Sequence, residues 1–359
     1  MHPDLGSPRR LKSHPVSEGT LGRTTSPQEL LLMARLYVTR QGARVHLERG
    51  KVTVTLGDEN LASVPKGCVK AILLFGRVSI TSQLVQFCLR GDCDLAFFTQ
   101  HGRYLGRTSS ALGKNIPLRI AQVHASEDPA FRLRLAAAFV LTKIRNSHRF
   151  VHRYAWNYPD ADVGDALDLL DKHKRAVLIA PDIETLRALE ARAARIYFRA
   201  LGKILAPVAC FMGRSRRPPK GMANVLLSLG YSVVTSECAA AIEAVGLDPG
   251  IGLFHSLRYG RPSLALDLVE EFRTPVAERL AVKLLRNHTR EFRDTGETEV
   301  TLTPEGFQRY FEFYEDLMSR PVLERGRRIT IRQAIHRQAA RLAACFRNRS
   351  AEYVPFLYK

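Results

Sequence analysis

The spacing of apolar residues changes once along this chain, near Ser109–Asn115, and this change constrains the fold most strongly. From Ala34 to about Thr108, apolar and polar residues alternate, whereas beyond the connector apolar residues recur every three or four positions. Alternation is typical of strands, and the longer spacing is typical of helices. We therefore predict an α+β fold with a small N-terminal β-sheet domain over 34–108, a linker over 109–118 and a larger all-helical domain over 119–359.

Local signals refine the first region. The stretch LYVTRQGARVHLERGKVTVTL alternates on both sides of Glu48-Arg49-Gly50-Lys51, which predicts a turn within an antiparallel sheet that has one buried face. The segment ITSQLVQFCLRG at 80–91 predicts a helix closed by Gly91.

The second region contains two helices of particular interest. Asp182 is placed to cap a helix that carries Glu190. Further along, an apolar column should pack inward and leave Asp267 and Glu270 turned elsewhere, and Pro275 should interrupt the helix just after these acids. The column comprises Leu264, Leu268, Phe272, Val276, Leu280 and Leu284.

Composition bounds the class of protein. The chain has 359 residues, 45% of them apolar, so we expect a globular protein. Its net charge of +19 predicts an acidic partner, and nucleic acid is the first candidate for that partner. Apolar runs such as AILLF and LAAAFVL are too short to span a membrane, and residues 1–33 lack the apolar core of a signal peptide. We expect a soluble cytoplasmic protein, no membrane partner, a flexible extension over 1–33, and six scattered cysteines that stay reduced.

Two basic segments suit contacts with the phosphates of a DNA duplex. The first is the loop GRSRRPPKG at 213–221, and the second is 325–349, which holds eight arginines and no acid and predicts an amphipathic helix with a cationic outer stripe. Each could equally be a solvated surface. The candidate DNA contacts are Arg214, Arg216, Arg217, Lys220, Arg258, Arg328 and Arg332.

The stretch GLFHSLRYGRPSLALDLVEEFR, 252–273, places His255 ahead of acids on a predicted helix. Carboxylates suit Mg²⁺ or Mn²⁺, and the imidazole favours tolerance of Mn²⁺. From spacing alone, an ordinary charged helix face and a structural histidine remain open. The sequence lacks P-loop, Rossmann, hydrolase-elbow and HExxH motifs, so any enzymatic reaction should be independent of nucleotide hydrolysis.

Several motifs in order show a family resemblance from about Leu36 to the C-terminus. They include VKAILLFGRVSITSQLV, LAFFTQHGRYLGR, KIRNSHR, LEARAARIYF and RRPPKGMANVLLSLGYSVV, followed by the 252–273 stretch. In these the chain resembles the CRISPR-associated integrases of spacer acquisition, the Cas one family. The resemblance implies a dimerising β domain and a catalytic helical domain in which Glu190, His255 and Glu270 bind catalytic Mg²⁺ or Mn²⁺. Asp267 and Arg273 would support these ligands or face DNA.

The resemblance also implies the reaction. A 3′-hydroxyl of a foreign DNA fragment would attack a phosphodiester at the edge of a CRISPR repeat, and a homodimer would act with a small partner, Cas two. This sequence departs from the family at Ala191, where glycine is usual, and after the acidic cluster, where the frequent RP…D of the family reads Arg273-Thr274-Pro275 followed by Glu278. Neither change removes a ligand. Two alternatives stay open: a non-catalytic, architectural DNA-binding protein, and a metal-dependent nuclease acting on RNA.

Overall fold

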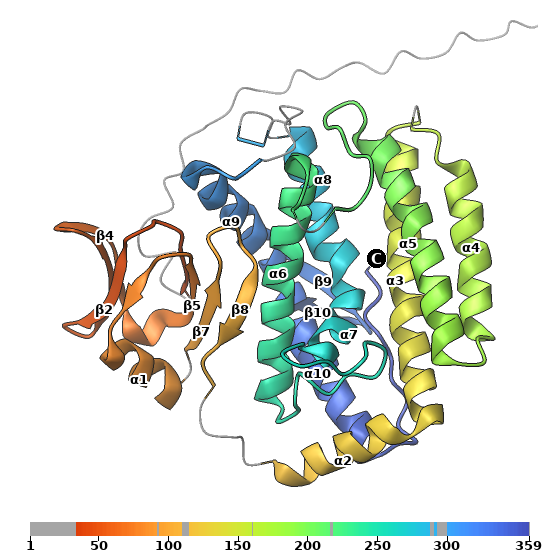
Figure 1. Cartoon of the computed structure of the whole chain (residues 1–359), viewed down its shortest axis with the longest axis horizontal. Coiled ribbons are helices and arrows are strands. Elements are labelled where there is room, and N and C mark those ends of the chain that lie inside the picture. Colours follow the sequence, from red (N-terminus) through yellow and green to blue (C-terminus); the bar gives the residue numbers. More distant parts are fainter. Residues whose placement is uncertain are drawn as a thin grey trace, which may run out of the picture.

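The computed structural model describes residues 34–91, 93–109, 115–159, 161–215, 218–287, 291–292 and 300–358. A β-rich region comes first and a larger, mainly helical region follows, as predicted (Figure 1). The expected N-terminal extension over 1–33 lies outside the described residues, as do Arg216 and Arg217.

The β-rich region is built from two sheets. One has the order β4(Glu59–Pro65), β3(Lys51–Leu56), β2(Arg44–Glu48), β6(Ser79–Ile80). The other has the order β1(Ala34–Val38), β5(Val69–Phe75), β7(Asp94–Phe98), β8(Tyr104–Arg107).

The antiparallel prediction holds for β2, β3 and β4 and is wrong for β1, which pairs parallel to β5. The pair β5 and β7 is parallel as well, because the helix α1 (Ser82–Arg90) lies in the connection between them and returns the chain to the same edge. Thr81 caps α1, and Gly91 ends it as predicted.

The predicted turn between β2 and β3 is confirmed. Arg49 and Gly50 have φ values of 45° and 79°, so both central residues lie in the left-handed region. Two such residues form the tight hairpin turn whose twist matches that of paired strands. Glycine takes this conformation at little cost, which explains the sequence Arg49-Gly50 at this position.

The sheet that contains β5 buries both of its faces, because successive side chains point to opposite sides of a strand. Ile72 and Leu74 join the core between the two sheets. Leu73 and Phe75 join the core of the helical region, where the ring of Phe75 lies 5.2 Å from that of Phe311. The β-rich region is therefore packed directly on the helices.

The helical region surrounds one long apolar helix, α6, which packs against α7, the π-helical turn η3 and α10 (Figure 1). By length and composition α6 could cross a membrane, but 72% of its apolar window is buried inside the fold. It is the central helix of the core. The described helices are α2(Ile116–Glu127), α3(Pro129–Asn157), α4(Gly164–Leu178), α5(Ile183–Leu205), α6(Gly221–Ala244), α7(Ser263–Phe272), η3(Arg273–Glu278), α8(Arg279–Asn287), α9(Pro304–Ser319) and α10(Ile331–Arg347).

Two boundaries differ from prediction. The arginine-rich segment does not form one helix over 325–349: a hairpin of β9 (Pro321–Glu324) and β10 (Arg327–Thr330) precedes α10. The domain over 119–359, which was predicted to be all-helical, is therefore not entirely helical. Thr330 starts α10 with a reciprocal capping box to Gln333, which fixes the helix start after the hairpin. The helix α2 also begins inside the expected linker, at Ile116.

The interruption predicted at Pro275 is confirmed. The α-helical hydrogen-bonding of α7 gives way to η3, a π-helical turn that contains Pro275 and leads into α8. Proline lacks the N–H that an α-helix needs, which accounts for the change of winding at this point. The predicted apolar column from Leu264 to Leu284 is buried throughout.

Candidate metal and phosphodiester site

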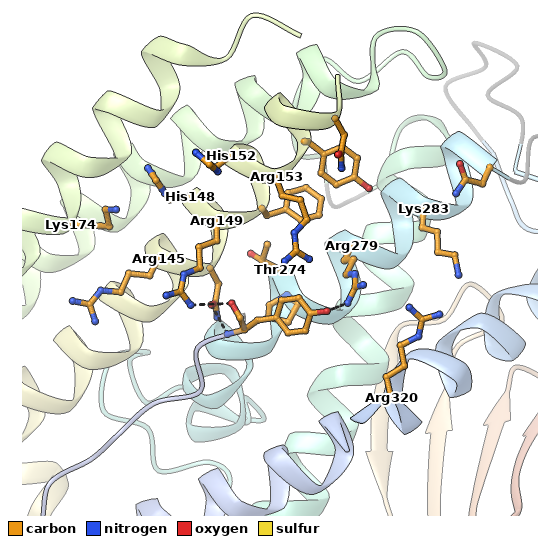
Figure 2. Close-up of a pocket in the computed structure, with 17 residues that line it drawn as sticks. Arg145, His148, Arg149, His152, Arg153, Lys174, Thr274, Arg279, Lys283 and Arg320 are labelled. Carbon is orange, nitrogen blue, oxygen red and sulfur yellow. Dashed lines mark hydrogen bonds between the residues drawn. The ribbon is translucent and has the colours of Figure 1, made fainter. Parts of the chain in front are cut away.

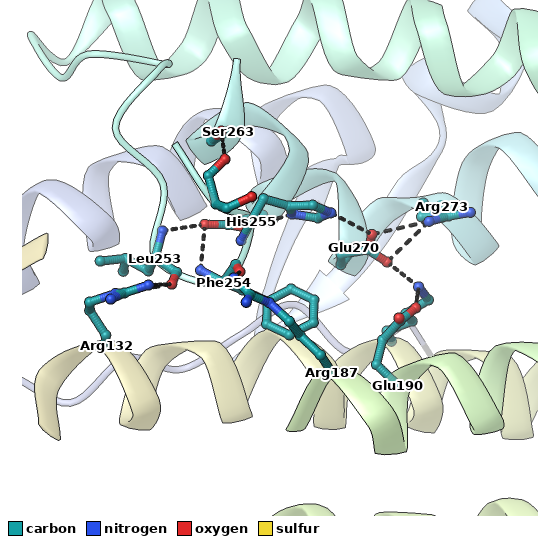
Figure 3. A network of polar contacts seen from close by, with 12 residues as sticks. Arg132, Arg187, Glu190, Leu253, Phe254, His255, Ser263, Glu270 and Arg273 are labelled. Atoms are coloured by element: carbon teal, nitrogen blue, oxygen red, sulfur yellow. Dashed lines mark hydrogen bonds and ion pairs between the residues drawn. The ribbon is translucent and has the colours of Figure 1, made fainter. Parts of the chain in front are cut away.

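Four parts of the chain meet at one cluster of charged side chains: α3, α5, α7 and the loop that precedes α7 (Figure 3). Glu190 comes from the middle of α5, whose first turn is capped as predicted by Asp182, which accepts a hydrogen bond from the Thr185 N–H. Glu270 comes from α7 and is 4% exposed. The structure thus brings together residues that are far apart in sequence.

Lys143 of α3 joins the two glutamates. Its ammonium lies 2.7 Å from Oε2 of Glu270 and also pairs with Oε1 of Glu190. The lysine side chain is 11% exposed, so the three charges form a largely buried triad. Lys143 lies in the motif KIRNSHR, but the sequence gave it no predicted role. The residues around a lysine do not reveal that it pairs with acids far away in the chain.

His255 is held in place by Asp267. One oxygen of the Asp267 carboxylate accepts from the N–H of His255 at 2.9 Å and lies 2.7 Å from its Nδ1. The other oxygen accepts from the N–H groups of Leu253 and Phe254 at 2.6 and 3.1 Å. A carboxylate next to Nδ1 favours the tautomer in which Nδ1 carries the proton. Nε2 is then unprotonated and has a free lone pair.

The Nε2 of His255 points toward Glu270, with 4.0 Å between it and Oε1 (Figure 3). The chain reaches this position through a tight approach at Gly252, where an added Cβ would lie 2.6 Å from the Cβ of Ser263. Arg187 of α5 donates to the carbonyl of Phe254 at 3.0 Å and braces the same loop. The loop is therefore fixed from both sides before any ligand binds.

Asp267 and Glu270 are not on a solvated helix face, because Asp267 is 0% exposed and α7 is buried all round. This excludes the ordinary charged face that spacing alone had left open. Burial alone raises the pKa of Glu270, but Arg273, Lys143 and His255 outweigh burial and hold that pKa well below its usual value. Glu270 is therefore ionised at neutral pH.

Arg273 is a second cation that contacts Glu270. Its guanidinium donates to Oε1 of Glu270 at 3.0 Å and stacks 4.3 Å from the ring centre of Tyr231. Tyr231 in turn donates to Glu278 at 2.7 Å. Glu278 lines a small space of about 10 Å³ together with Lys143 and Glu190, and its Oε2 has no hydrogen-bond partner. Sequence reasoning named Glu278 only as a departure from the family pattern and gave it no place in the site.

The donor chemistry of the cluster fits a divalent cation. Two carboxylates and an imidazole nitrogen are ligands that Mg²⁺ and Mn²⁺ accept, and a carboxylate behind the imidazole is the usual support. As they stand, no three His, Cys, Asp or Glu side chains of the described chain are arranged as a metal cluster. Lys143 lies between Glu190 and Glu270, so the position between these carboxylates already suits a cation.

The candidate DNA contacts differ in their surroundings. Arg258, three residues beyond His255, is exposed, and so are Lys220 and Arg328. Arg214 instead turns inward, donating to Asn224 and Ser228 at 2.9 Å each. Arg332 is engaged by Glu315 at 2.8 Å and Glu237 at 3.4 Å, so it is not part of an outer cationic stripe.

The fold and the cluster together define a class: basic α+β proteins whose helical region carries a buried acid and histidine cluster suited to phosphodiester chemistry. The family model described as CRISPR associated protein Cas1 matches residues 36–316. The chain is 35% identical to a CRISPR-associated endonuclease Cas1 of Thermus thermophilus over 89% of this chain and 96% of that protein. The chain belongs to the Cas1 family, as its motifs predicted.

Solved structures show the same fold. A casposase bound to integration product matches with a TM-score of 0.75 at 22% identity, over 89% of this chain and 92% of that one. A Cas6-RT-Cas1–Cas2 complex matches with a TM-score of 0.77 at 22% identity over 90% of this chain. There the present chain spans only 36% of the longer polypeptide.

Proposed function

We propose that this protein is an endonuclease and integrase of CRISPR adaptation, which inserts fragments of foreign DNA into a CRISPR array. The observation that carries the proposal is the cluster centred on Glu270, which shares Lys143 with Glu190 and lies 4.0 Å from Nε2 of His255. Family membership supports it, because relatives that match most of this chain are named CRISPR-associated endonucleases. The basic composition suits a DNA substrate.

Glu190, His255 and Glu270 would hold Mg²⁺ or Mn²⁺, and such an ion supplies neutralisation of the charge that develops on phosphate oxygens. The chain's own residues prepare this site. Asp267 presents Nε2 of His255, and Arg273 fixes the Glu270 carboxylate. Because these supports are buried and hydrogen-bonded, little reorganisation is needed when the substrate arrives.

The reaction is a transesterification. The 3′-oxygen of the incoming fragment forms a new bond to phosphorus, the bond from phosphorus to the 3′-oxygen of the repeat strand breaks, and the proton lost by the attacking hydroxyl is balanced by protonation of the leaving oxygen. One phosphodiester replaces another, so no nucleotide hydrolysis is needed. This agrees with the lack of a nucleotide-binding motif in the sequence.

The partners follow from the family. Solved structures of the same fold include a Cas6-RT-Cas1–Cas2 complex and a casposase bound to integration product, which supports DNA and Cas2 as partners here. We further propose a homodimer formed through the β-rich region and a cytoplasmic location, where DNA is accessible and thiols such as Cys88 and Cys93 stay reduced.

The decisive experiment is strand transfer of a labelled fragment into a repeat-bearing plasmid, with Cas2 and either Mg²⁺ or Mn²⁺. Glu190→Gln and His255→Ala should abolish product while leaving DNA binding nearly intact. The matched control is Glu127→Gln, since Glu127 at the end of α2 is 73% exposed and pairs only weakly with His124, at 4.0 Å. Unchanged product in either site variant would reject the site.

The same assay separates the alternatives. A non-catalytic, architectural DNA-binding protein would bind equally well with and without metal and form no product in Mn²⁺. A nuclease of RNA would degrade an RNA copy of the substrate faster than the DNA.

A further inference from the structure

Two buried cysteines are in contact where α1 leads into β7. Cys88 lies in the last turn of α1, Cys93 directly precedes β7, and their sulfur atoms are 3.7 Å apart. Both thiols are free and belong to the core between the two sheets, together with Leu84 of α1 and Leu95 of β7. Because α1 forms the connection between the parallel strands β5 and β7 (Figure 1), the pair lies at the end of this connection.

A small movement would bring the two sulfur atoms to bonding distance. The sulfurs of a disulfide are about 2.05 Å apart, so those of Cys88 and Cys93 need to approach each other by roughly 1.7 Å. Side-chain rotation supplies part of this movement. The backbone can supply the rest, because Cys88 is in the last turn of a helix and helix ends fray.

The contact makes the two thiols chemically unequal. A hydrogen bond from the Cys93 thiol stabilises the Cys88 thiolate and lowers the pKa of Cys88, and the same contact raises the pKa of Cys93. The thiolate is the form of cysteine that reacts with oxidants. Cys88 is therefore the thiol that reacts first, and Cys93 is placed to react with the product.

The pair is buried but lies close to the surface. Cys88 is 6% exposed and Cys93 is 4% exposed, whereas the neighbouring Leu89, Arg90 and Gly91 are exposed. Hydrogen peroxide is little larger than water, so it can reach Cys88 when the last turn of α1 opens. Glutathione disulfide consists of two linked tripeptides and is too large to enter in this way.

We propose that Cys88 and Cys93 are a site of reversible oxidation, at which hydrogen peroxide converts the two thiols into a disulfide. The Cys88 thiolate attacks one peroxide oxygen, the O–O bond breaks and hydroxide leaves, which gives a sulfenic acid. The sulfur of Cys93 then bonds to that of Cys88, and the sulfenic hydroxyl leaves as water with the proton of Cys93. In total the two thiols lose two electrons and two protons, and the peroxide is reduced to two water molecules.

In a reducing compartment the pair rests as two thiols, and cellular dithiols return the disulfide to that state by exchange. The disulfide links α1 covalently to the start of β7, so the last turn of α1 can no longer open freely. Neither cysteine is among the described residues that line the large basic cavity beside α3 (Figure 2) or the small space beside Lys143. The inference therefore goes beyond the proposed function and does not depend on it.

The test uses the whole protein, treated briefly with an equimolar amount of hydrogen peroxide, then blocked with an alkylating reagent and digested with trypsin. Trypsin cuts after Arg90, between the two cysteines, so the disulfide appears as a pair of joined peptides that dithiothreitol separates. Most wild-type molecules should give the joined peptides. Glutathione disulfide at the same concentration should give about tenfold less, because buried thiols are protected from large reagents.

Cys88→Ser and Cys93→Ser should each abolish the joined peptides. Cys93→Ser should also increase labelling of Cys88 by a dimedone probe, because its sulfenic acid then has no thiol to react with. Cys210→Ser is the matched control, since Cys210 is exposed and lies outside the pair, and it should leave the joined peptides unchanged. If a variant does not fold, the wild-type peptides decide alone. Cys88 and Cys93 that both remain open to alkylation, or Cys88 recovered only as sulfinic acid, would overturn the proposal.

Hydrogen exchange of the wild type gives a second measurement. Oxidation should slow the exchange of amides in the last turn of α1 by about tenfold, because the disulfide opposes the opening of that turn. Amides of α9, far from the pair in sequence and outside its core, should exchange at the same rate in both states. Equal exchange of α1 in oxidised and reduced protein would contradict the covalent link.

Discussion

The ammonium of Lys143 lies 2.7 Å from Oε2 of Glu270, in the position between two glutamates that a divalent cation would share. The same ammonium pairs with Glu190, so one lysine of α3 bridges the two carboxylates. Without a cation the two carboxylates would repel each other in a largely buried place. A divalent metal ion bound between these carboxylates would therefore compete with Lys143 for the same electrostatic role.

We predict that Lys143→Met destabilises the metal-free protein by roughly 3 kcal/mol, because it removes the cation that the two largely buried carboxylates share. Added Mn²⁺ should restore more stability in the variant than in the wild type. Thermal unfolding with Mn²⁺ and with a chelator checks this. Lys174→Met is the control, since Lys174 pairs with the half-exposed Asp171. Equal responses of variant and wild type to Mn²⁺ would contradict the prediction.

Asp267→Asn should weaken metal binding while leaving the fold intact. The carboxylate accepts from three backbone N–H groups and orients the imidazole of His255, and an amide can supply only one accepting oxygen. Loss of such a support typically costs about tenfold to a hundredfold in metal affinity. The measurement is the Mn²⁺ concentration that gives half-maximal strand transfer.

The control for Asp267→Asn is Asp248→Asn in the same loop, where the carboxylate accepts only from the N–H of Gly250. This change should leave the Mn²⁺ requirement unaltered. If both variants shift it equally, the effect belongs to loop stability and not to the orientation of His255.

Local patterns in the sequence were enough to predict several elements. The Arg49-Gly50 turn, the Asp182 cap and the break at Pro275 were predictable because each depends on the conformational preferences of a few adjacent residues. The parallel pairing of β1 with β5 was missed because pairing direction depends on the path of the connecting chain, and no short window of sequence records that path.

The candidate cluster was predictable only in part. Family motifs pointed to Glu190, His255 and Glu270, but Lys143 and Glu278 acquire meaning only when α3, η3 and α5 come together.

Stability should depend on pH through Glu271. Burial raises the pKa of this carboxyl to about 7, although the N–H of Phe356, the hydroxyl of Tyr353 and the amide of Gln338 oppose the shift. A folded-state pKa above the unfolded value means that the folded protein holds the proton more tightly. The stabilisation is thus complete below about pH 4.5 and is lost as the pH rises through 7, a change of roughly 3 kcal/mol.

Urea unfolding between pH 5 and 8 checks the prediction for Glu271, by comparing the wild type with Glu271→Gln. In the wild type the unfolding free energy should fall as the pH rises, and in the variant most of this fall should be absent. Glu305→Gln, an exposed change in the first turn of α9, should keep the wild-type slope. A variant slope equal to that of the wild type would show that another group titrates.

Arg258→Gln should affect DNA binding and Arg332→Gln should affect stability, although both residues were candidates for DNA contact. Arg258 is exposed near His255, so its loss should reduce the salt slope of duplex binding by roughly 0.9 and leave stability unchanged. Arg332 pairs with Glu237, which also binds Arg35 of β1 at 2.9 Å and so ties the β-rich region to the helices. Its loss should lower the unfolding free energy by about 3 kcal/mol and leave the salt slope intact.

Duplex binding across a salt series, with urea unfolding of the same preparations, separates the two roles. A reduced salt slope for Arg332→Gln with unchanged stability would reverse this assignment.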